Sequence, residues 1–253
     1  MSGYRHFEYA RSAIQLNVID YLLKPIDEKQ LNETLEKVCN QLNQRREEQE
    51  KHKKLEEYEA AQDQSRLEDF WKIITQRDQE RGKQLLISEE VCNRSFPTEF
   101  NHPNYQMVYV DTNIDGMLTL DNSLFSEKVC NYINGCFKNL AHVIYYSDYR
   151  GHVILLNFKE DKKAEIKNAV LALFYQIRDL NEVYGNFRIN IGSSRIKSSC
   201  SKLIEAFEEA IVAEWGRLVF FGSMVTDYDQ IAGLPRFDRA MVVSGQEEKG
   251  VQR

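Results

Sequence analysis

Apolar residues between positions 83 and 232 follow two different spacings, and these predict alternating strands and helices. Short β-branched and aromatic runs, which are typical of strands, occupy residues 105–110, 143–146, 153–156 and 187–192. Stretches with apolar side chains at helical spacing occupy residues 124–140, 162–180 and 201–213. Residues 218–221 are expected to begin a last strand. The order β-α-β-β-α-β-α-β favours an α+β domain whose helices cover an antiparallel sheet.

A long helix is predicted before this domain. Asp27 is a suitable N-cap with Gln30 completing a capping box, and apolar residues then follow four, three and four positions apart, at Leu31, Leu35, Val38 and Leu42. This seam fails at Arg45, and residues 45–69 are rich in charges spaced to form pairs along a helix. Two interpretations stay open: a solvated linker helix without a partner, and a dimerising signalling helix. Apolar residues return at Leu67, Phe70, Trp71, Ile73 and Ile74, which should dock the helix onto the following domain.

Residues 1–26 read as a helix followed by a short buried strand. Apolar residues recur at helical spacing within 6–16, and residues 18–23 form a β-branched and apolar run that ends at Lys24 and Pro25. A buried parallel strand needs cover on both faces, so this part is expected to be the least stable. The tail, residues 233–253, contains few apolar residues and is expected to be disordered.

Composition narrows the classes of partner and cofactor. The formal net charge is -6, which argues against direct DNA binding through the chain's own surface. The apolar runs are far shorter than the ~20 residues that span a bilayer, so we expect no membrane association and a cytoplasmic location. The five cysteines form no C-x-x-C pair and the histidines are scattered, which predicts free thiols, no metal and no cofactor.

Two motifs in residues 1–26 resemble the final third of a response-regulator receiver domain. They are S-G-Y-x-x-F-E-Y-A from Ser2 and D-Y-L-L-K-P from Asp20, spellings typical of the branch with an AraC-type DNA-binding output. The resemblance implies that Ser2 and Lys24 contact a phosphoryl group, that Tyr21 is the switch aromatic, and that Pro25 is the cis-proline after the lysine. The acceptor aspartate and the acidic pair for Mg²⁺ lie on earlier strands in that family, so these four receiver residues are expected to be orphaned.

The later domain resembles the degenerate cyclase-like (GGDEF-like) domain that some of these regulators carry. Aligned on the strand after it, the catalytic turn corresponds here to residues 148–152, and Gly151 stands where the resemblance places the catalytic glutamate. Asp111, Asp115, Asp148 and His152 are the remaining polar positions near that expected site. One carboxylate at Asp111 is a poor Mg²⁺ site, so no catalytic residue and no enzymatic activity are expected.

The sequence therefore predicts four segments: a partial receiver domain (1–42), a helical linker that is a possible coiled coil (43–82), a degenerate GGDEF-like domain of ferredoxin-like, cyclase-like type (83–232) and the tail. The expected function is non-enzymatic: a fragment of a two-component response regulator, cut at both ends from its phosphoacceptor and DNA-binding parts, that serves phosphorelay signalling and transcription regulation. The resemblance implies that the parent protein pairs with a sensor histidine kinase and DNA. The alternatives are a dimeric adaptor that acts on full-length relatives through the helix, and a nucleotide-binding cyclase-like domain.

Overall fold

The computed structural model describes residues 27–113, 122–148, 151–184, 187–218 and 224–233. The receiver-like residues Ser2, Tyr21, Lys24 and Pro25 lie outside these ranges, as do Asp115 and the tail from residue 234. The chain divides into two units, residues 1–62 and 63–253, and helix α2 (Glu28–Thr75) has residues in both.

In the first unit, the described residues are Asp27 and the N-terminal part of α2. The Oδ1 atom of Asp27 accepts a hydrogen bond from the backbone N–H of Gln30 at 2.9 Å, so Asp27 caps the helix as the sequence predicted. Two leucines of the predicted seam are exposed, Leu35 at 51% and Leu42 at 48%. From residue 39 to residue 62 every side chain is exposed.

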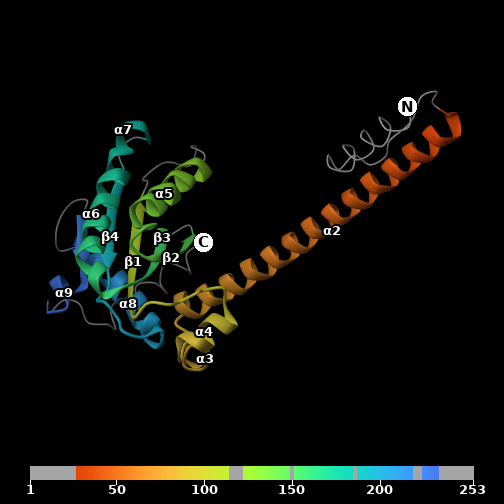
Figure 1. Ribbon diagram of the computed structural model, residues 1–253. Coiled ribbons are helices and arrows are strands. Elements are labelled where there is room, and N and C mark those ends of the chain that lie inside the picture. The colour runs from red at the N-terminus through yellow and green to blue at the C-terminus, as the bar shows by residue number, and fades with distance from the viewer. Residues whose placement is uncertain (1–26, 114–121, 149–150, 185–186, 219–223, 234–253) are drawn as a thin grey trace, which may run out of the picture. The chain divides into compact units, whose positions relative to one another are not determined.

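The second unit is built on a five-stranded sheet in the order β2-β3-β1-β4-β5 (Figure 1). Its strands are β1 (Asn104–Asn113), β2 (His142–Asp148), β3 (Gly151–Phe158), β4 (Arg188–Ser193) and β5 (Met224–Asp227). Neighbouring strands are antiparallel, except that β4 and β5 are parallel. The predicted α+β class and antiparallel sheet are confirmed. The first four strands have the order of the split β-α-β arrangement.

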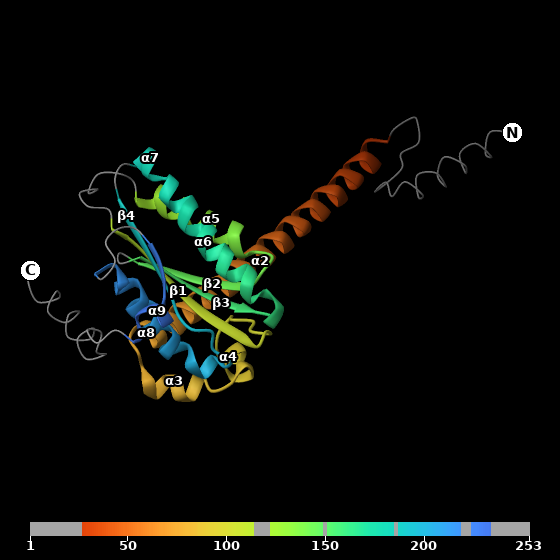
Figure 2. The same cartoon turned by 90° about the vertical axis from the view of Figure 1, so that its left-hand side faces the viewer.

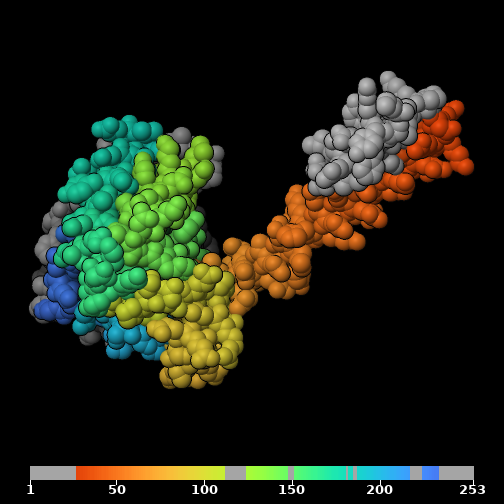
Figure 3. Space-filling view, viewed as in Figure 1, coloured from red at the N-terminus to blue at the C-terminus, as the bar shows by residue number. Residues whose placement is uncertain are grey.

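Helices cover both faces of this sheet (Figure 2). Helices α5 (Asn122–Phe137) and α6 (Lys163–Asp179) lie on one face, and α8 (Leu203–Glu214) packs against β1 and β4 on the other. Shorter helices are α3 (Gln79–Leu85), α4 (Glu89–Ser95), α7 (Asn181–Tyr184) and α9 (Tyr228–Ile231), with 3₁₀ turns η1 (Glu160–Lys162), η2 (Cys200–Lys202) and η3 (Trp215–Leu218). In the space-filling view, α5 and α6 form adjacent ridges (Figure 3).

The alternation of side chains along the strands creates two apolar cores. Met107 of β1 belongs to the core beneath α8, while Val108 belongs to the core beneath α5 and α6. The last turns of α2 complete the α8 core, because Phe70 and Ile73 are fully buried there. The predicted docking of the helix end is confirmed, and these turns belong to the second unit.

Arg77 ends this helix in a left-handed conformation, with φ of 55°. The backbone N–H of Asp78 donates to the carbonyl of Ile73 at 2.9 Å, and that of Arg77 donates to Ile74 at 3.2 Å, which together form a Schellman motif. Glycine is usual at this position, and here the Nε atom of Arg77 lies 3.6 Å from a carboxylate oxygen of Glu208 on α8.

The predicted start of the last strand, at Leu218, is wrong. Leu218 ends the 3₁₀ turn η3, and the described strand begins at Met224. Tight 3₁₀ turns often finish an α-helix, and η3 follows directly after α8. Residues 219–221, the rest of that prediction, lie outside the described ranges.

Candidate functional site

The predicted cyclase-site positions gather at one end of the sheet, where β1 ends and the β2–β3 hairpin turns. Asp148 pairs with Gly151, Val110 pairs with His152, and Asp111 pairs with Asn190 of β4. The topology therefore brings Asp111, Asp148, Gly151 and His152 to neighbouring register positions. Sequence reasoning did not single out Asn190, whose pairing depends on a strand far away in the chain.

The sheet nevertheless separates two of these residues by face. Paired residues of antiparallel strands point to the same face, so His152 shares the face of Val110, which belongs to the core beneath α5 and α6. Asp111, next to Val110, lies on the opposite face together with Asn190. His152 is 4% exposed and Asn190 is 3% exposed. One small ligand cannot reach both His152 and Asp111 without crossing the sheet.

Gly151 has no room for a side chain. Its φ is +151°, and a Cβ atom built on it would lie 2.3 Å from the backbone oxygen of Val110. Real Cβ atoms essentially never come so close to another heavy atom, and backbone cannot move aside as a flexible side chain can. A glutamate at this position would therefore require the hairpin to separate from β1.

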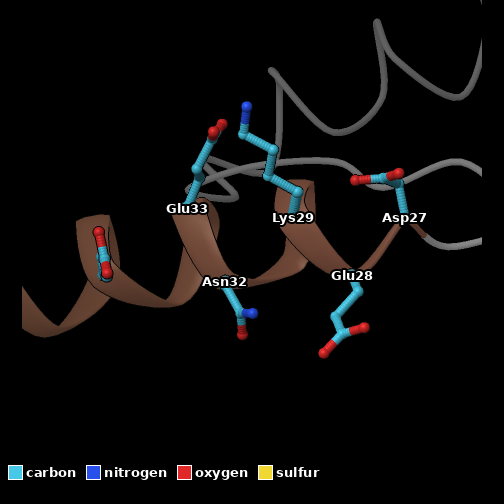
Figure 4. A pocket seen from close by; sticks show the side chains of 6 residues that line it. Asp27, Glu28, Lys29, Asn32 and Glu33 are labelled. Atoms are coloured by element: carbon cyan, nitrogen blue, oxygen red, sulfur yellow. The ribbon is translucent and has the colours of Figure 1, made fainter.

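Within residues 27–113, 122–148, 151–184, 187–218 and 224–233, no group of three or more histidine, cysteine, aspartate or glutamate side chains could hold a metal ion. The hollow at the start of α2 does not change this. It is lined by Asp27, Glu28, Lys29, Asn32, Glu33 and Glu36. Figure 4 shows Lys29 and Glu33 pointing away from Glu28 and Asn32, so these polar groups do not converge.

A buried ionic cluster that the sequence analysis missed lies between β4 and α8. The Nζ atom of Lys197 is 2.8 Å from Glu209 and 3.0 Å from Glu205. Arg195 donates to Glu209 from its backbone N–H at 3.0 Å and from its guanidinium at 3.0–3.1 Å. Glu209 is 1% exposed and Lys197 is 7% exposed. The sequence feature that could have revealed this cluster is Glu209 itself, because it is an acidic residue on the helical face that also carries Ala206 and Ala210.

This cluster fixes a loop rather than forming a reactive site. Lys197 also exchanges two backbone hydrogen bonds with Tyr105 at the start of β1, each 2.8 Å long. The carboxylate of Glu209 is fully engaged with Lys197 and Arg195, so no acceptor is left pointing into a cavity. The arrangement ties residues 194–197 to both α8 and β1.

Two buried cysteines lie in the α8 core. Burial raises the pKa of the Cys92 thiol to about 12 and that of the Cys200 thiol to about 11. A thiol with such a pKa is almost entirely protonated at neutral pH, and the thiolate is the reactive form. Both are free cysteines, as the sequence predicted, and neither has the properties of a nucleophile.

No helix in the described part of the chain combines the length and apolar character needed to cross a bilayer. Comparison with models of protein families finds no family that matches the chain, and comparison with characterised proteins finds no significant match.

Proposed function

We propose that this chain is a non-enzymatic regulatory segment of the two-component response-regulator type. In this proposal α2 is a signalling helix that self-associates. The α+β unit is a degenerate cyclase-like module that receives the conformational change carried by this helix. The observation that supports it best is α2 itself: one continuous helix exposes leucines near its start and buries its last turns in a domain core.

The two ends of α2 have the properties that a helix needs in order to carry a conformational change along its length. Leu35 and Leu42 are exposed and lie seven residues apart, at the spacing of a coiled-coil seam. Phe70 and Ile73, which follow Leu42 by 28 and 31 residues, are fully buried, so a rotation or shift of the helix end must disturb the α8 core. Packed cores resist continuous deformation and therefore convert such a shift into a discrete change.

The seam contributes modestly to association. Fully burying a leucine is worth ~1.5–3 kcal/mol, so burying the exposed half of Leu35 and of Leu42 in both copies contributes roughly 4 kcal/mol. Association itself costs about 4–15 kcal/mol. The leucines therefore offset only the low end of that cost, so a dimer needs a further contact beside them.

The hairpin end of the sheet favours a module without catalysis. His152 and Asp111 lie on opposite faces, and Gly151 cannot be replaced by a glutamate without moving β1. Both observations disfavour a nucleotide site of the cyclase kind.

Sedimentation equilibrium of the full chain tests the proposal. We expect the average mass of the wild-type chain to rise with concentration, and the double variant Leu35→Glu/Leu42→Glu to associate more weakly. The matched control is Leu55→Glu, which alters a leucine of similar exposure (57%) outside the seam and should behave as wild type. Equal association of the seam variant and the wild type would overturn the role of the helix.

A further inference from the structure

Strand β2 is the outermost described strand on its side of the sheet (Figure 1). All seven of its residues, His142–Asp148, pair with β3 on the inner side. Among the described residues, no other backbone group bonds to β2. An edge strand leaves alternate N–H and C=O groups pointing outward, and these are a template for another strand.

β2 lacks the usual features that protect an edge. Its register with β3 runs from His142 to Asp148 without interruption, so no bulge twists the edge away. Its sequence, H-V-I-Y-Y-S-D, contains no proline, lysine or arginine. The strand is also longer than the very short edge strands that resist pairing, since strands commonly have about 5–6 residues.

The strand is held firmly in place by both cores. Ile144 is 6% exposed and Tyr146 packs against Trp71 with ring centroids 5.8 Å apart, both on the α8 side. Val143 packs against the core beneath α5 and α6. Tyr145 is 38% exposed. The edge is therefore presented by a fixed strand, with a large aromatic residue at its centre.

We propose that β2 pairs antiparallel with β2 of a second copy of this chain, about a two-fold axis at Tyr145, so that two five-stranded sheets become one. A second copy fits because the strand is complementary to itself in this register. Tyr145 lies opposite Tyr145 of the second copy and Ile144 lies opposite Tyr146, which are the aromatic and aromatic–aliphatic pairs that stabilise antiparallel ladders. His142 lies opposite Asp148, so this register sets no two acidic and no two basic residues directly opposite one another.

The kind of contact also suits a second copy of this chain. The exposed leucines of α2 are too few to hold a dimer by themselves, and a ladder of main-chain hydrogen bonds adds affinity without a large apolar patch. An isologous strand pair closes on itself and adds no further copies through that edge. The proposal does not require the helix seam, because it concerns the α+β unit alone.

The test uses the full chain carrying Leu35→Glu/Leu42→Glu, so that the helix contributes little. In this background Tyr145→Lys and Tyr145→Glu each place like charges directly opposite one another across the two-fold axis. We expect about tenfold weaker self-association for each, measured by sedimentation equilibrium. An equimolar mixture of the two variants should associate again, because lysine then faces glutamate.

Matched variants separate this effect from misfolding and from surface charge. Tyr145→Phe should retain association, since the ring stays. Tyr175→Lys, at a tyrosine of α6 that is 50% exposed, should also retain it. Near-ultraviolet circular dichroism checks that each variant is folded. Ser147→Lys replaces any Tyr145 variant that is not, and it should weaken association by a smaller factor because it places a lysine opposite Val143 of the second copy.

Three results would overturn the proposal. The first is that the seam variant stays monomeric at high micromolar concentration. The second is that the Tyr145→Lys variant associates as well as the Tyr175→Lys variant. The third is that the mixture of the Tyr145→Lys and Tyr145→Glu variants stays monomeric. The helix proposal is tested separately, with β2 unchanged. It fails if the seam variant and the wild type associate equally strongly.

Discussion

Replacing Glu209 by glutamine removes the charge at the centre of the buried cluster and should destabilise the α+β unit strongly. The one remaining amide oxygen can still accept the hydrogen bond from the backbone N–H of Arg195. The new NH₂ group then faces Lys197 and the Arg195 guanidinium, so the change removes both the charge and the acceptor that these cations use. Breaking a buried ion pair costs about 3–5 kcal/mol, because the remaining charge stays buried and poorly compensated. Lys197 keeps Glu205 as a partner at 3.0 Å, which places the expected loss near ~3 kcal/mol.

The matched control is Glu205→Gln. Glu205 bonds to the same Lys197 ammonium but its side chain is 43% exposed, and exposed ion pairs contribute at most about 1 kcal/mol. Urea denaturation followed by far-ultraviolet circular dichroism gives both free energies of unfolding. A loss below about 1 kcal/mol for Glu209→Gln, or equal losses for the two variants, would refute the assignment of Glu209 as the central partner.

Three further predictions concern other parts of the chain. Gly151→Ala should lower the free energy of unfolding by about 2 kcal/mol or more, because its Cβ meets the Val110 oxygen, and Gly151→Glu should show no cyclase turnover with GTP and Mg²⁺ in a nucleotide assay. Burial raises the pKa of the Cys92 thiol from 9.0 to about 12, so the stability it contributes is fully present below pH 9 and is lost as the pH rises towards 12. Urea denaturation below and above pH 9 should therefore show a smaller fall in the free energy of unfolding for Cys92→Ala than for the wild type. Ile73→Ala should cost about 2–5 kcal/mol in urea denaturation, whereas Leu55→Ala should stay within about 0.5 kcal/mol of wild type.

The elements of the α+β unit could be predicted because each has a strong local signal. The runs at 143–146 and 153–156 lie inside β2 and β3, and the helical spacing over 162–180 corresponds to α6. Leu218 was predicted to begin a strand but ends a 3₁₀ turn, because a short apolar stretch at this point suits either element. Periodicity cannot separate these for short apolar runs.

The candidate site was only partly predictable. The sequence placed Asp111 and His152 near one end of the sheet, but which face each occupies depends on pairings with residues far along the chain. The cluster around Glu209 escaped notice for the same reason. Its partners Arg195 and Lys197 lie in the loop after β4, and nothing local shows that this loop folds back onto α8.

The central position of β1 has a consequence for how the protein is made. Both of its neighbours, β3 and β4, are later in the chain, so a nascent polypeptide cannot close the sheet until Ser193 has been synthesised. At ~5–20 residues per second, β1 waits roughly 4–16 s after its own completion for its last partner. During that time the β4 side of β1, from Val108 to Asn113, lacks its partner. Messages that end before β4 should therefore yield chains that depend on chaperones and are removed by proteolysis.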